Sequence, residues 1–162
     1  MSDSFDDRLE AAIQRGRRRG KDEQAAARRD AMSDEELKQL HTSYRLSLSD
    51  RIESAVRRLC NHFPGFQQET LFGEKGWGAA CSRDDLSLDR GRRSTRYSRL
   101  EMTIRPLGEY MVLELKGKGT IANKEIYNRS HFVDLVDVDV TEFERLIDAW
   151  VVEYAEQFAT QA

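Results

Sequence analysis

The chain has 162 residues, of which 39% are hydrophobic and 34% are charged, and its formal net charge is −3. This length suits one domain with an extension, and the polar composition suggests that part of the chain lies outside the core. The slightly acidic balance gives no overall case for nucleic-acid binding, and no stretch approaches the roughly 18 apolar residues of a membrane span.

The first residues of the chain and its possible metal-ligand residues further restrict which class of protein it can be. Residues 1–10 are acidic and lack the apolar core of a signal peptide, so we expect a cytoplasmic protein with no membrane partner. The two cysteines and three histidines form no paired metal-ligand motif, so no metal and no cofactor is expected. In that compartment the two thiols are expected to be reduced.

Residues 1–32 are predicted to form a charged arm that is partly helical or disordered. Phe5, Leu9 and Ile13 are spaced as a thin helical stripe, which glycines 16 and 20 then interrupt. A stripe this narrow cannot offset the chain entropy lost on folding. The arm is therefore expected to stay frayed or to become ordered against a partner.

Residues 33–162 are predicted to form a single α+β domain that opens with a long helix. Ser33 and Glu36 have the spacing of a capping box, in which each side chain satisfies a backbone N–H of the first turn. Apolar residues then recur at three- and four-residue steps over residues 37–63, up to the Pro64-Gly65 pair that ends the helix.

After this helix the apolar period falls toward two, which is typical of strands. Strands are expected over residues 66–72, 77–83, 97–105, 110–122 and 125–133. Residues 84–94 are expected to be a polar loop, and a turn at residues 117–119 is an alternative to one near Asn123-Lys124.

A second amphipathic helix follows a cap at Asp139 or Thr141. The predicted fold is an antiparallel meander of about five strands, with the helix of residues 33–63 and the C-terminal helix packed on one face.

Two amphipathic helices cover about one face of such a sheet, and the other face is then polar. The candidate binding surface on that face comprises Tyr97, Arg99, Glu101, Arg105, Tyr110 and Glu114, with Trp77 nearby. One interpretation is an ordinary solvated face, since polar and apolar residues alternate in antiparallel sheets that have one face in water. The second interpretation is a partner surface, because Tyr and Arg are favoured at interface cores.

One pairing on this face would have chemical consequences. If residues 106–109 form a four-residue loop, Glu101 lies opposite Glu114, and the pKa of one carboxyl rises as a general acid requires. A three-residue loop with a bulge would break this pairing. A small enzyme or ligand-binding domain with a carboxylate pair is therefore an alternative function.

Residues 90–96 contain a cluster of arginines, which is a candidate rim or anion contact: Arg90, Arg92, Arg93 and Arg96. Residues 83–132 contain eleven Lys/Arg and seven Asp/Glu, a net +4, whereas residues 133–162 contain one and eight, a net −7. This polarity favours charge matching within or between chains over phosphate binding. A nucleic-acid-associated protein is kept as a second, disfavoured alternative.

Together these features favour a non-enzymatic protein-binding or adaptor module. Its contact elements would be the open sheet face and the N-terminal arm, with a protein partner or a second copy of the chain.

Overall fold

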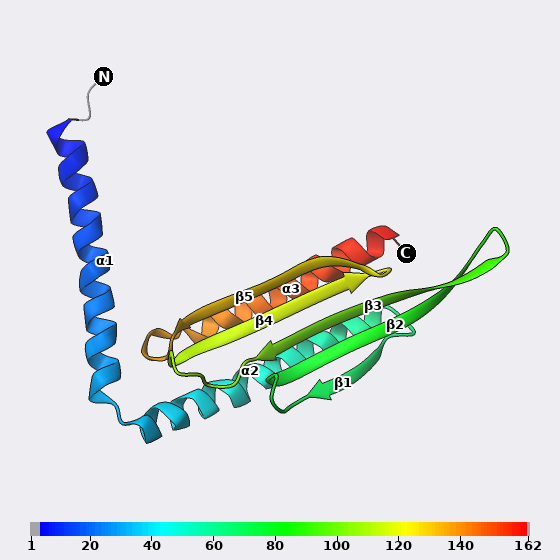
Figure 1. The fold of residues 1–162 in the computed structure, drawn as a ribbon, viewed down its shortest axis with the longest axis horizontal. Coiled ribbons are helices and arrows are strands. Elements are labelled where there is room, and N and C mark those ends of the chain that lie inside the picture. Colours follow the sequence, from blue (N-terminus) through cyan, green and yellow to red (C-terminus); the bar gives the residue numbers. More distant parts are fainter. Residues whose placement is uncertain (1–3, 162) are drawn as a thin grey trace.

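Figure 1 shows a computed structural model that describes residues 4–161, apart from the side chains of Arg29 and Asp89. Residues 1–3 of the predicted arm and residue 162 lie outside the described residues. The elements are α1 (Phe5–Ala31), α2 (Asp34–His62), β1 (Gln67–Leu71), β2 (Trp77–Asp89), β3 (Arg92–Ile104), β4 (Val112–Ile121), β5 (Lys124–Asp134), the 3-10 turn η1 (Leu135–Asp137) and α3 (Val140–Gln161).

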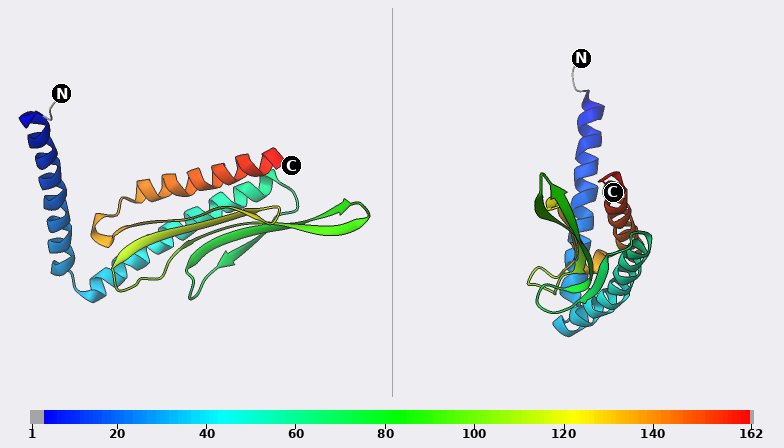
Figure 2. Two further views of the ribbon diagram at one scale, coloured as in Figure 1. Left: turned by 45° about the horizontal axis from the view of Figure 1, so that its top comes forward. Right: turned by 90° about the vertical axis from the view of Figure 1, so that its right-hand side faces the viewer.

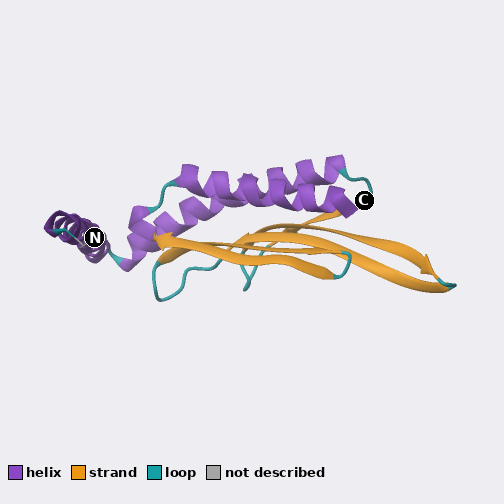
Figure 3. Cartoon of the chain, turned by 90° about the horizontal axis from the view of Figure 1, so that it is seen from above, coloured by secondary structure: helices purple, strands orange, loops and turns teal. Residues whose placement is uncertain are grey.

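The five strands pair antiparallel in the order β1-β2-β3-β4-β5, which is a meander. Helices α2 and α3 lie side by side on one face of this sheet, and Figure 3 shows no helix on the other face. The predicted α+β fold class is therefore confirmed. Among the described residues, no helix is both long and apolar enough to cross a membrane.

The core lies between the two helices and the sheet. The stripe of α2 buries Leu48, Ile52 and Val56, and α3 buries Phe143 and Ile147 against the inward side chains of β3 and β4. The predicted cap is present, because the Ser33 hydroxyl accepts from the Glu36 N–H at 3.2 Å. Apolar residues at helical spacing thus define one side of α2 and α3, and burial of that side fixes both on the same sheet face.

The glycines of β4 explain how α3 comes so close to the sheet. A Cβ on Gly117 would lie 2.7 Å from the indole of Trp150, and one on Gly119 would lie 3.0 Å from the ring of Tyr154. The alternative turn at residues 117–119 is wrong, because both glycines lie within β4 and pair with residues of β3 and β5. The turn instead lies at Ala122 and Asn123, which have φ angles of 48° and 69°.

Strands β2 and β3 continue far beyond the other strands as a two-stranded ribbon (Figure 1). The expected polar loop at residues 84–94 is therefore wrong: only Arg90 and Gly91 form the turn, with φ angles of 52° and 78°. Both residues with positive φ match the primed hairpin turn, whose twist suits two long paired strands. The two strands pair through residues such as Asp85 and Arg96, whose opposite charges favour this register.

Helix α1 runs without a break through both of its glycines and stands away from the sheet (Figures 1 and 2). Only its last turns touch the body of the molecule, where Ala25 is buried and the Arg28 guanidinium forms an ion pair with Asp137. Met32, just after the helix, packs at the edge of the core. The described part of the predicted arm is thus helical, and almost all of its surface is exposed.

Candidate functional site

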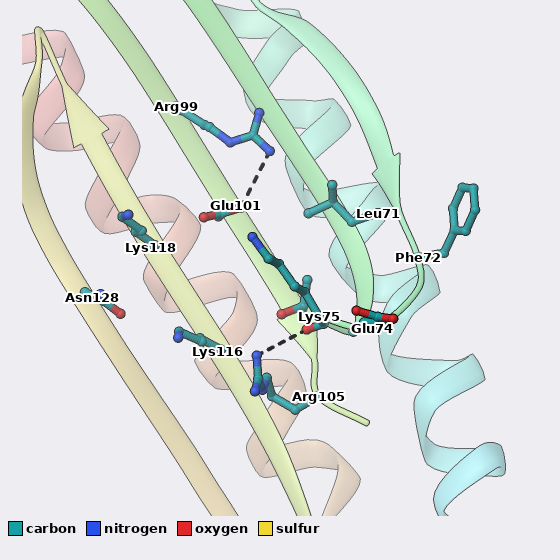
Figure 4. A pocket seen from close by; sticks show the side chains of 12 residues that line it. Leu71, Phe72, Glu74, Lys75, Arg99, Glu101, Arg105, Lys116, Lys118 and Asn128 are labelled. Atoms are coloured by element: carbon teal, nitrogen blue, oxygen red, sulfur yellow. Dashed lines mark hydrogen bonds and ion pairs between the residues drawn. The ribbon is translucent and has the colours of Figure 1, made fainter. Parts of the chain in front are cut away.

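The open face is the sheet face opposite α2 and α3, and its central side chains come from β3 and β4. There Thr103 pairs with Lys116 and Glu101 pairs with Lys118, so long polar side chains stand in two neighbouring rows. This face holds a hollow of about 660 Å³ (Figure 4), lined by Leu71, Phe72, Glu74, Lys75, Gly76, Arg99, Glu101, Thr103, Arg105, Lys116, Lys118 and Asn128.

Small residues of β2 lie beside this hollow. Gly78 and Ala80 lie directly across from Thr103 and Glu101, and both are buried. A Cβ on Gly78 would lie 2.0 Å from the Met102 carbonyl oxygen, so the strands could not pair here with a larger residue. No long side chain therefore rises from the middle of β2, between the β1 edge and the β3 row.

The lining carries five cationic side chains and two carboxylates. The Arg99 guanidinium is held by two acids, with the Glu69 carboxylate at 2.9 Å and the Glu101 carboxylate at 3.5 Å. Lys118 lies 3.9 Å from the Glu125 carboxylate. These contacts neutralise the end of the hollow nearest Arg99.

The remaining cations of the lining form what we call the cationic triad: Lys75, Arg105 and Lys116. In the part of the chain that the structure describes, none of the three forms an ion pair with a carboxylate. The Arg105 guanidinium donates instead to the Lys75 carbonyl at 3.5 Å, as Figure 4 shows. The lining as a whole has five cationic side chains against two carboxylates, Glu74 and Glu101, and this excess of positive charge favours an anionic group at this place.

The predicted surface residues divide into two groups. Arg99, Glu101 and Arg105 line the hollow, whereas Tyr97, Tyr110 and Glu114 do not. Tyr97 lies at the base of the ribbon, and Tyr110 lies in the β3–β4 loop with 77% of its surface exposed. Glu114 is on β4, opposite Phe132 of β5.

The predicted carboxylate pair is wrong, because the register differs. Glu101 pairs with Lys118, and the loop that joins β3 to β4 spans residues 105–111 instead of four residues. Arg105 donates its N–H to the Glu114 carbonyl at 2.9 Å, so it does not face Tyr110. Pro106 lacks a backbone donor, and Met111 has a φ of 51°, which together make this loop longer than a tight hairpin.

The tryptophan expected near the open face lies on the other side of the sheet. Trp77 pairs with the inward-facing Ile104, and the Arg45 guanidinium of α2 stacks over its ring at 4.2 Å. This contact fixes the end of β2 to α2, so Trp77 has a structural environment away from the hollow.

The arginine cluster is separated from the hollow. Arg90, Arg92, Arg93 and Arg96 lie on the outer part of the ribbon, where all four are exposed. Leu86 and Leu88 are also exposed there, at 78% and 76%. The sequence placed the arginines in a loop beside the sheet, and the structure places them on a projecting strand pair.

The predicted site residues include two of the five cations of the hollow, Arg99 and Arg105. Lys116 and Lys118 continue the outward alternation of β4, which is a usable signal, but the possible turn at residues 117–119 obscured it for Lys118. Lys75 lies in the β1–β2 turn, and its position over the sheet depends on the fold of that turn (Figure 4). No local sequence pattern indicates that the Lys75 side chain lies over the sheet.

Nucleophilic and metal chemistry find no support among the described residues. Burial raises the pKa of the Cys81 thiol and of the neighbouring Cys60 thiol, so both are protonated at neutral pH. No group of three or more His, Cys, Asp or Glu side chains within residues 4–161 is placed to hold a metal ion.

Comparisons of the chain with protein-family models, with curated proteins and with solved structures gave no match.

Proposed function

We propose that this chain is a non-enzymatic protein-binding module that receives an acidic segment of a partner on its open sheet face, with α1 as a second contact element. The observation that carries the proposal is the cationic triad of Lys75, Arg105 and Lys116, which lines an uncovered hollow and has no carboxylate partner within the described residues. The proposal keeps the cytoplasmic location expected from the sequence.

The size of the hollow supports this function. A volume of about 660 Å³ lies within the range of common ligand pockets, roughly 300–1,000 Å³, and could hold one or two acidic side chains. Two aromatic rings are exposed on the sheet: Phe72, which lines the hollow just after β1, and Phe132 on β5, opposite Glu114 of β4. Aromatic residues and arginine are common at interface centres, which favours a protein segment over a free small anion.

The test is binding of a fluorescein-labelled glutamate-rich peptide, followed by fluorescence anisotropy at low and high salt. Lys116→Glu places a negative charge, the sign that the peptide carries, in the hollow. This variant is expected to weaken peptide binding by about tenfold or more. Arg145→Glu is the matched control, because it makes the same charge change at an exposed position of α3. Binding by the wild type is expected to weaken with added salt.

Two results would count against the proposal. Equal affinities of the Lys116→Glu and Arg145→Glu variants would show that the open face is not the site. Tighter binding of a single-stranded DNA of equal charge, lost in Lys116→Glu, would replace the protein partner by nucleic acid.

A further inference from the structure

The outer half of α1 has an exposed apolar stripe and stands apart from the other described elements (Figure 2). Phe5, Leu9 and Ile13 are 68%, 46% and 45% exposed. A single helix without tertiary contacts is only marginally stable in water, and its apolar stripe gains from being covered.

Small residues continue this stripe toward the middle of the helix. At 3.6 residues per turn, Ala12, Gly16 and Gly20 fall on the same face as Phe5 and Leu9. Nothing lies within 4 Å of the Cβ position of either glycine, so the surface over them is open. The face therefore has a protruding half, with large side chains, and a flat half, with almost none.

This face points away from the body of the molecule. Ala25, which is buried, lies on the opposite side of the helix by the same periodicity, and Arg28, which pairs with Asp137, lies on the flank between that side and the stripe. A second helix can therefore approach the stripe without meeting η1 or α2.

We propose that α1 pairs antiparallel with α1 of a second copy of this chain. In this pairing Phe5 packs over Gly20 of the partner subunit, Leu9 over Gly16 of the partner subunit, and Ile13 beside Ala12 of the partner subunit. The contact is isologous, so each copy supplies both the large and the small side chains, and all three contacts occur twice. The close approach at the glycines is what lets each large side chain be covered.

The order of charges along α1 favours the antiparallel direction. On one flank of the stripe, Asp6 and Glu10 come level with Arg17 and Lys21 of the partner subunit, which gives opposite charges across the contact. A parallel pair would instead set the basic segment of residues 15–21 against itself and leave the glycines facing each other. On the other flank, Arg8 comes level with Arg15 of the partner subunit, and Arg15 with Arg8 of the partner subunit. Repulsion between these arginines limits the affinity.

This inference rests on the proposed role of α1 as a contact element and names its partner. An interface made by a few turns of two helices is small, so the association belongs to the weak, concentration-dependent class. The open face takes no part in it, which leaves that face free for a different ligand.

Sedimentation equilibrium of the full chain over a wide range of concentration tests the association. The wild type is expected to show a monomer–dimer equilibrium. Gly16→Leu raises helix propensity but fills the space that receives Leu9, so it is expected to weaken dimerisation at least tenfold with α1 still helical. Arg18→Leu is the matched control, because it adds the same side chain on the opposite face, and it is expected to dimerise as the wild type does. Arg15→Glu removes the repulsion with Arg8 of the partner subunit and is expected to tighten the dimer.

The orientation is tested with a nitroxide attached at position 21 in a Cys60→Ala background. In the antiparallel pair the two labels lie about 25 Å apart along the helix axis, whereas a parallel pair places them side by side. A wild type that stays monomeric at every concentration, a Gly16→Leu chain that dimerises unchanged, or labels side by side at position 21 would each overturn the proposal. Binding of the glutamate-rich peptide by Gly16→Leu is expected to be unchanged, so failure of this pairing is distinguishable from failure of the open-face site.

Discussion

Gly117 decides how closely α3 can approach β4. A Cβ at this position would lie 2.7 Å from the Trp150 ring, closer than real contacts allow, and the ring is itself held in the core. Gly117→Ala is therefore expected to lower the free energy of unfolding by about 1–3 kcal/mol, the usual cost of overpacking. Chemical denaturation followed by circular dichroism measures this difference.

The matched control is Gly108→Ala in the β3–β4 loop. Nothing lies within 4 Å of the Cβ position of Gly108, so its replacement is expected to leave stability unchanged or slightly raised. Equal stabilities of the two variants would mean that Trp150 moves aside without cost and that the glycine is not required for packing.

His41 is a buried polar residue of α2 whose Nε2 lies 3.2 Å from the Arg105 carbonyl oxygen. Burial lowers the pKa of His41 below 6.5, and the nearby Arg45 charge adds to this effect, while the hydrogen bond to Arg105 opposes it. The unfolded chain therefore binds a proton more readily than the folded chain does. As pH falls through about 6.5 toward the lower folded value, stability is lost.

His41→Gln removes this titration and retains a donor for the Arg105 carbonyl. The loss of unfolding free energy between about pH 7.5 and pH 5.5 is expected to be smaller in the variant than in the wild type. Denaturant titrations at the two pH values give this comparison, and parallel pH profiles would show that His41 does not carry the effect.

At the scale of elements, α2 and α3 were predictable, whereas the ribbon and the unbroken course of α1 through Gly16 and Gly20 were not. Helix α2 shows a capping box and a long apolar period, and both are local signals that survive in any tertiary context. The outer ribbon buries nothing, and only Leu86 and Leu88 alternate with polar residues there, which is too short a pattern to indicate two long strands. Its base is held by a distant residue: Asn123 accepts from the Tyr97 N–H at 2.9 Å and donates to the Thr95 carbonyl at 2.9 Å.

The candidate site was predictable only in part, because local patterns show which face a side chain takes but not which residue lies across the sheet from it. Outward alternation along β3 placed Arg99, Glu101 and Arg105 on one face, and all three line the hollow. Their partners across the sheet depend on the length of the loop at residues 105–111, where Met111 takes a positive φ that its side chain does not indicate. A shift of register changes every cross-strand neighbour, so the expected carboxylate pair became Glu101 beside Lys118.

At the scale of the whole molecule, the two proposed contacts lie on separate parts. The helical layer covers one sheet face, and α1 extends away from the sheet and its helices (Figures 1 and 3). The hollow opens on the other sheet face. Binding at the hollow and pairing through α1 can therefore occur together without competing for the same surface. Two copies joined by α1 would present two hollows to one partner, which raises overall affinity when the partner spans both.

The separation of α1 from the body also predicts how truncated chains behave. The side chains of residues 4–21 are almost all exposed, so removing residues 1–21 is expected to change the free energy of unfolding by less than about 1 kcal/mol. Removing residues 1–32 also deletes buried Ala25 and the Met32 contact, and a loss of about 1–2 kcal/mol is expected. Both truncated chains retain the Ser33 cap of α2 and are expected to unfold cooperatively.

Thermal and denaturant unfolding of the two truncated chains, with sedimentation equilibrium beside them, checks this division into an arm and a domain. Both chains are expected to be monomeric at concentrations where the full chain associates, because each lacks the stripe that begins at Phe5. A chain lacking residues 1–21 that no longer unfolds cooperatively would place the outer half of α1 within the folding unit. The predicted boundary at residue 33 would then be wrong, since the body could not form without a helix that it barely contacts.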